Sequence, residues 1–154
     1  MKAATATFAL AAAGPDDVPA IAALLREAEL PHEDFAAHLA HFLVARRVDE
    51  VVGAIGFERH GRAALLRSLV VAPARRGAGL GGRLVSRLTA EARRNGVTRF
   101  YLLTTTAEVF FAKRGFRKIA RRRVPARIAA TREFKSLCPV SAVCMTRPLA
   151  VAKR

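Results

Sequence analysis

RGAGLGG, at residues 76–82, lies between an apolar strand-like run and a helical pattern, and it decides how the chain is interpreted. Its four glycines allow the backbone to approach a ligand closely and to adopt positive φ angles. The helix that follows presents unpaired N–H groups in its first turn, together with the positive end of its dipole. Such a loop and helix bind phosphate or pyrophosphate, and Arg75 and Arg76 add positive charge at the rim.

Two common phosphate loops do not fit this stretch. The P-loop pattern ends in Lys followed by Ser or Thr, whereas the loop here ends in Gly82-Arg83. The dinucleotide fingerprint GxGxxG can be placed on Gly77, Gly79 and Gly82. That motif follows the first strand of its fold and precedes an acidic residue by about 20 positions. Here several strand-like runs come first and residues 93–99 contain no acidic residue, so the dinucleotide motif does not fit. The alternative to a phosphate-binding loop of another kind is a turn with a purely structural role.

Hydrophobic periodicity and turn residues predict strands and helices on both sides of the loop. The last three strands before it are joined by two tight turns, which favours an antiparallel meander. Strand, loop, helix and strand in succession form a crossover that places two neighbouring strands in parallel. The predicted strands are residues 1–13, 42–46, 51–58, 63–71, 100–103, 116–121 and 140–146. The predicted helices are residues 16–29, 33–40, the segment from the loop to Asn95-Gly96, 107–114 and 125–137.

Composition and charge limit the classes of function. The 27 Lys and Arg residues exceed the 12 Asp and Glu residues, and the net charge of +15 attracts nucleotide phosphates, nucleic acid or acidic proteins. The arginines are spread along the chain, which favours a solvated basic surface, and we do not expect nucleic acid as a partner. Because no apolar run approaches the roughly 20 residues of a bilayer span, we expect no membrane partner.

The alanine-rich start, residues 1–13, has two interpretations. It resembles a weak secretion signal, because it is apolar and carries one lysine. Thr5, Thr7, Phe8 and Leu10 suit a β-strand instead, and Asp16 or Asp17 can begin a helix directly afterwards. We therefore expect a first strand and a cytoplasmic protein.

Neither the cysteines nor the histidines predict a metal centre. Cys138 and Cys144 are too few for a disulfide scaffold or for four zinc ligands. They could bind a metalloid, but ordinary core or edge cysteines are the simpler interpretation. The four histidines lie in the first half of the chain without metal-ligand spacing, so we expect no metal cofactor.

The segments around the loop resemble the acetyl-coenzyme A (acetyl-CoA) loop of GNAT N-acetyltransferases. Val71-Ala72-Pro73 is followed by the pattern Arg/Gln-x-x-Gly-x-Gly/Ala, which Arg76, Gly79 and Gly81 match. Farther along, Ala107, Phe110-Phe111 and Gly115-Phe116 resemble the second motif of the family. The resemblance covers nearly the whole chain and implies an α/β GNAT fold, with a central mixed, mostly antiparallel sheet flanked by helices. It also implies one domain over residues 1–154, which could form a homodimer.

The resemblance implies a mechanism in which a substrate amine attacks the thioester of acetyl-CoA directly. The fourth strand would pair with the pantetheine arm, the loop amides would hold the pyrophosphate, and a backbone N–H near Val71 would polarise the carbonyl. The fourth and fifth strands would splay apart around the thioester. The cofactor-binding residues implied are Leu69, Val70, Val71, Arg76, Gly77, Ala78, Gly79, Leu80, Gly81, Gly82, Thr104 and Phe111.

The catalytic positions depart from the family pattern. Many GNAT enzymes have a tyrosine at the position of Phe111 and a glutamate near Arg67 or Ser68, and neither Phe111 nor Arg67 can transfer a proton. Three alternatives remain: water and the acidity of the thiol suffice, another residue substitutes, or the cofactor is bound without catalysis. The substitutes considered are Ser68, Glu58, Tyr101 and Cys138.

A narrower resemblance links the chain to acetyltransferases associated with arsenic-resistance operons. It rests on residues 64–71, 102–108 and 137–142. It implies a small, anionic amino-acid-like acceptor, bound by Arg67, Thr105, Thr106 and Cys138. Arg67 has a second interpretation, as the partner of Glu58 on the adjacent strand. Acetylation of a protein, or a non-catalytic module that senses CoA or binds nucleic acid, remains the alternative function.

Overall fold

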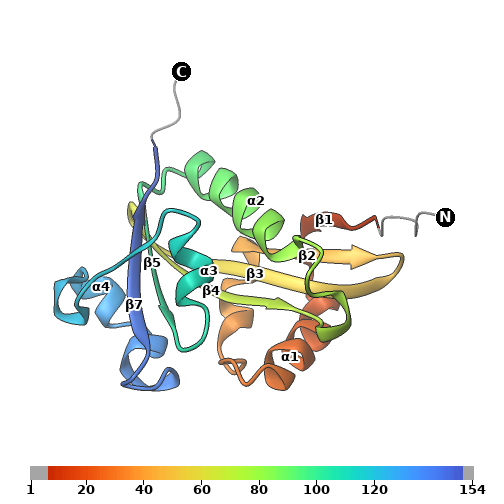
Figure 1. Ribbon diagram of the computed structural model, residues 1–154, viewed down its shortest axis with the longest axis horizontal. Coiled ribbons are helices and arrows are strands. Elements are labelled where there is room, and N and C mark those ends of the chain that lie inside the picture. The colour runs from red at the N-terminus through yellow and green to blue at the C-terminus, as the bar shows by residue number, and fades with distance from the viewer. Residues whose placement is uncertain (1–6, 151–154) are drawn as a thin grey trace. The chain divides into compact units, whose positions relative to one another are not determined.

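The computed structural model describes residues 7–150, which fall into two compact units. Unit 1 contains residues up to Gly56 and Ser68–Leu88, and unit 2 contains Phe57–Arg67 and the chain from Thr89 onward. The described strands are β1 (Ala9–Ala12), β2 (Phe42–Arg47), β3 (Glu50–His60), β4 (Ala63–Val71), β5 (Arg99–Thr104), β6 (Arg117–Lys118) and β7 (Val143–Pro148). They are hydrogen-bonded in the order β1-β2-β3-β4-β5-β7-β6. β3 and β4 contribute residues to both units. Figure 1 labels each of these strands except β6.

The helices of the described chain are mostly short. The α-helices are α1 (Val18–Glu27), α2 (Leu80–Arg94), α3 (Glu108–Ala112) and α4 (Ala126–Ala129). Single turns of 3₁₀-helix cover η1 (Pro15–Asp17), η3 (Pro73–Arg75) and η4 (Arg121–Arg123), η2 (Phe35–His41) is a longer 3₁₀ segment, and η5 (Glu133–Leu137) is a π-helix. No helix among residues 7–150 is long and apolar enough to span a bilayer.

In unit 1, antiparallel strands pack against the first helix. β1 pairs with β2 from Ala9↔Arg46 to Ala12↔Leu43, and β2 pairs with β3. The antiparallel β2–β3 pair confirms that part of the predicted meander. The buried core of this unit consists of Ile21, Leu25, Phe35, Phe42, Val44, Ala54 and Val70. α1 supplies two of these residues from one face, as its apolar spacing predicts.

In unit 2, β5 lies between a parallel and an antiparallel neighbour. β4 and β5 are parallel over three pairs, from Ala63↔Arg99 to Leu65↔Tyr101. This confirms the predicted crossover through α2. On its other side β5 pairs antiparallel with β7 along its whole length. Leu65, Tyr101, Val124, Ile128 and Cys144 form the buried cluster of this unit.

Several predicted element boundaries were right, because local signals set them. β4 occupies Ala63–Val71 as predicted, and Gly96 ends α2 with a φ of 84°. The predicted first strand is present as Ala9–Ala12, while residues 1–6 lie outside the described chain.

Other boundaries were wrong. The helix predicted for residues 33–40 is a 3₁₀ segment with non-helical angles at His38. The predicted strand 116–121 is reduced to Arg117–Lys118. The predicted helix 125–137 divides into α4 and the π-helix η5, because the Thr131 hydroxyl bonds the Ile128 carbonyl and competes with the helical ladder.

Asp17 ties the start of α1 to strand β2. Its carboxylate accepts a hydrogen bond from the Gly14 N–H at 2.8 Å and another from Arg46 Nη2 at 2.8 Å. The Gly14 hydrogen bond, with help from Arg46, holds the pKa of Asp17 below its usual value, although burial opposes this. Asp17 therefore stabilises the unit most when it is ionised.

We predict that Asp17→Asn lowers the free energy of unfolding by about 1–2 kcal/mol at pH 7, as expected for hydrogen bonds to a charged group. Because the folded pKa is depressed, this contribution is present above the unfolded value of about 3.8 and is lost as the pH falls through the folded pKa. Urea denaturation at pH 7 and near pH 3 measures the difference between wild type and variant at each pH. Asp16→Asn, at the exposed neighbouring residue, is the control. An equal loss for Asp17→Asn at both pH values would contradict the charge argument.

Candidate functional site

The loop after β4 has the backbone that its glycines predicted. Gly77 and Gly79 have φ angles of 89° and 79°, in the left-handed region that other residues rarely adopt. A Cβ at either position would meet no atom within 4 Å, so the loop backbone faces open space. Residues 76–79 are all exposed. The glycines are therefore needed for the backbone conformation and for the close approach of a ligand.

α2 begins directly behind this loop. Leu80 is buried and anchors the first turn, and the Arg83 N–H donates to the Gly79 carbonyl at 3.2 Å. By helix geometry, the N–H groups at the start of such a helix have no acceptor within it, and they carry the positive end of its dipole. Gly81 and Gly82, in the same turn, are half-buried. A loop and first helical turn of this kind have the geometry that binds anions in proteins.

Tight packing on β3 positions this part of α2 within unit 1. A Cβ on Gly53 would lie 3.1 Å from the Val70 carbonyl oxygen and 3.2 Å from Leu84 Cδ1. Both distances are shorter than ordinary contacts, so Gly53 allows α2 and β4 to lie this close to β3. The sequence offered no signal for this role.

The end of β4 contains an unusual backbone angle. Ser68 has a φ of 62° within the strand, which is strained for a residue other than glycine. Val70 points into the core of unit 1, while Leu69 and Val71 are half-buried. Arg76 Nε donates to the Val71 carbonyl at 3.1 Å, which ties the loop to the strand. Ser68 was among the predicted site residues, but no pattern in the sequence indicated this backbone conformation.

Unit 2 contains a buried cluster of charged side chains. The Arg67 side chain has no exposed surface, and its Nη1 donates to Glu58 Oε2 at 2.6 Å. Its Nε lies 3.6 Å from Glu133 Oε1, a carboxylate contributed by η5. His60 Nε2 lies 3.5 Å from Glu58 Oε1. The second interpretation of Arg67, as a partner of Glu58, agrees with this geometry, whereas Glu133 was not anticipated.

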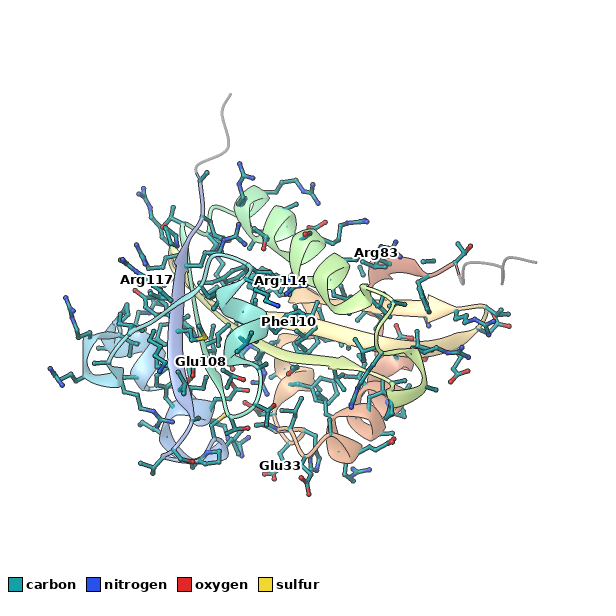
Figure 2. All side chains as sticks on the ribbon, in the orientation of Figure 1. Glu33, Arg83, Glu108, Phe110, Arg114 and Arg117 are labelled. Carbon is teal, nitrogen blue, oxygen red and sulfur yellow. The ribbon has the colours of Figure 1, made fainter. Side chains whose placement is uncertain are left out.

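Phe111 belongs to a chain of aromatic rings. Its ring meets Phe110 edge-on at 5.1 Å and Phe116 at 5.3 Å, and Phe116 stacks on Phe100 at 6.4 Å. Arg114 lies 3.6 Å above the Phe110 ring and donates to the Phe110 carbonyl (Figure 2). Phe111 is buried, and its ring offers packing but no proton.

The polar residues named after β5 have different environments. Thr104 Oγ1 accepts a hydrogen bond from the Ala107 N–H at 2.9 Å and shapes the turn that leads into α3. Thr105 and Thr106 are exposed. Tyr101 packs in the buried cluster of unit 2. Among these residues, Thr105 and Thr106 are thus the accessible ones.

The two cysteines differ in burial. Cys144 lies in the core of unit 2, and burial raises the pKa of its thiol to about 11, partly offset by the charge of Arg121. Cys138 is half-buried, and its N–H donates to the Glu133 carbonyl at 3.0 Å. Cys144 is therefore a core residue, as the simpler interpretation predicted, and Cys138 follows the segment that carries Glu133.

A family model described as "Acetyltransferase (GNAT) domain" matches residues 38–118, which is more than half of the chain. The chain belongs to the GNAT acetyltransferase family. The matched region contains the whole loop, the start of α2, Arg67 and Phe111. The predicted fold class is thereby confirmed, and the family is the one that the predicted enzyme class belongs to.

Solved structures share this GNAT fold. N-acetylglutamate synthase from Neisseria gonorrhoeae, in complex with CoA and N-acetyl-glutamate, superposes with a TM-score of 0.83 over 94% of this chain, at 23% identity. The chain spans only 36% of that protein. Rv2747 from Mycobacterium tuberculosis, in complex with CoA and a second ligand, gives a TM-score of 0.79 at 26% identity, with 92% of this chain and 99% of that chain covered.

A third solved structure with this fold is that of an enzyme named for a protein substrate. The ribosomal-protein-S18-alanine N-acetyltransferase from Escherichia coli has a TM-score of 0.69 and 17% identity, and the alignment covers 96% of this chain and 97% of that chain. At this identity the likeness shows the fold alone. A search of curated proteins found no matching relative.

We predict that Arg67→Met destabilises the protein by about 3–5 kcal/mol, because two buried carboxylates lose the cation that they share. Glu133→Gln should cost clearly less, since the 2.6 Å contact between Arg67 and Glu58 remains. Arg62→Met, at an exposed arginine next to β4, should change stability by less than about 0.5 kcal/mol. Urea denaturation ranks the three variants, and equal effects of Arg67→Met and Arg62→Met would contradict a structural role for the cluster.

We also predict that Cys144 resists alkylation in the folded protein. Burial raises the pKa of this thiol from the usual 9.0 to about 11, which lowers the thiolate fraction about 100-fold near pH 8. In Cys138→Ser, iodoacetamide should modify Cys144 at least about 100-fold more slowly in native protein than in urea, as measured by mass spectrometry. In the variant Cys144→Ser, the rate of iodoacetamide labelling is that of Cys138 alone. Fast labelling of Cys144 in the native protein would contradict the prediction, because it would show that the core around this thiol opens to the reagent.

Proposed function

We propose that this GNAT chain transfers the acetyl group of acetyl-CoA to the amino group of a small, anionic amino-acid-like molecule. The observation that carries the proposal is the left-handed backbone at Gly77 and Gly79 in front of the first turn of α2. That arrangement suits a pyrophosphate, and the family uses it for acetyl-CoA. The cytoplasmic location, the single domain and the homodimer remain predictions.

The loop residues each have a part in holding the cofactor. Amides in residues 77–82 donate to the pyrophosphate, and the exposed guanidinium of Arg76 neutralises its charge. Leu69 and Val71 offer main-chain groups to the pantetheine arm, as a neighbouring strand would. The strained angle at Ser68 redirects the backbone just before these groups, which supports a functional role for that strain.

The transfer needs little acid catalysis from the protein. The amine nitrogen forms a bond to the thioester carbonyl carbon, the carbon–sulfur bond breaks, and the CoA thiolate leaves. The proton lost by the amine ends on the thiolate or on water. Phe111 cannot supply a proton, which supports the interpretation that a thiolate leaves without a dedicated acid.

The general base that accepts the amine proton is sought among Tyr101, Glu58 and Ser68. Tyr101 packs inside the core of unit 2, and Glu58 is held by Arg67. Ser68 is nearly buried at the strained position in β4. A water molecule that accepts the amine proton is consistent with all three placements.

Arg67 can bind an acceptor oxyanion only by exchanging a partner. Its contact with Glu58 is short, while the contact with Glu133 is 3.6 Å, so Glu133 is the partner more readily replaced. The exposed Thr105 and Thr106 and the half-buried Cys138 are the other proposed acceptor contacts. A role in arsenic resistance is a hypothesis that rests on the narrower resemblance.

The test of the activity is the release of free thiol from acetyl-CoA. Purified protein is incubated with acetyl-CoA and a panel of glutamate, aspartate, phosphinothricin-like and arsenical amino acids, with lysine as a cationic control. We expect release with acidic amino acids and little with lysine. Acetyl label that enters only protein would favour a protein acceptor, and CoA binding without release for any acceptor would show a non-catalytic module.

We predict that Gly79→Ala weakens acetyl-CoA binding by at least about tenfold, equivalent to 1.4 kcal/mol. The methyl group would project from the loop face and disfavour the left-handed angle needed there. Isothermal titration calorimetry measures the affinity. Gly96→Ala is the matched control, because Gly96 has a φ of 84° at the far end of α2 and the same intrinsic strain. Equal affinities for the two variants would overturn the assignment of the loop.

A further inference from the structure

The net charge of the chain belongs entirely to unit 2. Unit 1 contains eight Lys and Arg residues and eight Asp and Glu residues, so its formal charge is zero. Unit 2 contains 19 Lys and Arg residues and four glutamates, which gives the whole +15. A composition bias would act on both units alike. The difference between them therefore needs a cause specific to unit 2.

The four glutamates of unit 2 are already engaged within the unit. Glu58 and Glu133 share the buried Arg67, Glu91 pairs with Arg94, and Glu108 pairs with Lys118 at 3.1 Å. Figure 2 labels Glu108. Each carboxylate thus has a cation partner, and the remaining positive charge of the unit has no carboxylate of its own to balance it. The exposed arginines within this excess can meet an external anion.

Part of this excess lies on the β3–β4 turn and on the segment from η4 to α4, and we call these residues the arginine face: Arg59, Arg62, Arg122, Arg123 and Arg127. All five residues are exposed. Arg59 and Arg62 flank the β3–β4 turn, and Arg59 Nε donates to the Gly61 carbonyl at 3.1 Å. Arg127 Nη1 lies 3.2 Å from the position of a Cβ on Gly61, so α4 brings its guanidinium to the same turn.

The other two residues of the arginine face immediately precede α4. Arg122 and Arg123 lie in the η4 turn, which leads into α4 through Val124 and Pro125. In Figure 2, long side chains with nitrogen ends project outward around α4. The approach of Arg127 to Gly61 thus brings together two segments of unit 2 that are some 60 positions apart in sequence.

We propose that the arginine face binds the phosphate backbone of nucleic acid without reading its sequence. A guanidinium matches the geometry of a phosphate with two parallel hydrogen bonds, and 15 of the 19 cations of unit 2 are arginine. The exposed large apolar residues of the described chain, Val48, Val109 and Val140, all lie outside the β3–β4 turn, η4 and α4. An interface with a protein would be expected to offer an aromatic or aliphatic anchor, so a polyphosphate fits better than an acidic protein.

This binding is a function beyond acetyl transfer and revises the expectation that nucleic acid is not a partner. That expectation rested on arginines scattered along the sequence. The proposed cofactor loop lies at residues 76–82 in unit 1, and no residue of the arginine face belongs to that unit. No residue of the arginine face is among the cofactor-binding residues that the family resemblance implies, so the two kinds of binding can be tested with separate variants.

The test uses the full chain with a fluorescently labelled mixed-sequence DNA duplex and a labelled RNA hairpin. Anisotropy is followed over a series of salt concentrations. We expect micromolar dissociation constants that weaken linearly on a log–log scale, with a slope of about 0.9 per phosphate contact for the duplex. The RNA arm distinguishes the two sources of phosphate backbone. Polyglutamate and vesicles of anionic lipid are the competing ligands.

The variant Arg122→Gln/Arg123→Gln/Arg127→Gln removes three charges from the face. We expect a clearly weaker dissociation constant and a salt slope lower by roughly 2–3 units. The matched control, Arg26→Gln/Arg47→Gln/Arg87→Gln, removes three exposed charges from unit 1 and should leave the slope nearly unchanged. Calorimetry with acetyl-CoA and thermal melting check that both triple variants are folded.

Four results would overturn the proposal. The first is no binding of either nucleic acid near physiological salt. The second is an equal effect of the two triple variants, which would show attraction to net charge and no defined face. The third is tighter binding of polyglutamate, which would assign the face to an acidic protein. The fourth is tighter binding of anionic vesicles, which would assign it to a membrane surface.

Discussion

The first turn of α2 has hydrogen-bond donors that the helix itself cannot use, and the proposed chemistry of the protein depends on them. A phosphate satisfies such donors only if the chain reaches the helix without covering them. The left-handed angles at Gly77 and Gly79 meet this condition, because they turn the backbone while leaving the space in front of it open. The buried side chain of Leu80 then holds the turn in place.

In the charged cluster of unit 2, buried opposite charges stabilise one another. One guanidinium lies between two carboxylates, and burial makes each of them costly without its partner. The cluster links β3, β4 and η5, and so it joins two core strands to the irregular segment before Cys138. A π-helix is seldom favoured by local sequence and often marks a functional position. Here it directs Glu133 inward.

The two units offer two kinds of anion recognition, which differ in where the positive charge comes from. The loop recognises an anion through main-chain donors and a helix dipole, in a unit of zero formal charge. Unit 2 carries its excess on long arginine side chains around α4 and the β3–β4 turn. The first kind depends on shape at short range, and the second depends on summed charge and on ionic strength.

Local signals in the sequence were enough to predict the glycine loop, the bounds of β4, the left-handed end of α2 at Gly96 and the parallel crossover. Glycine positions and hydrophobic periods act over a few residues, so they can be interpreted without the fold. The pairing of Arg67 with Glu133 and the approach of Arg127 to the Gly61 turn became visible in the folded structure alone. These contacts join residues more than 60 positions apart, and no local pattern specifies which distant side chains a packed core will bring together.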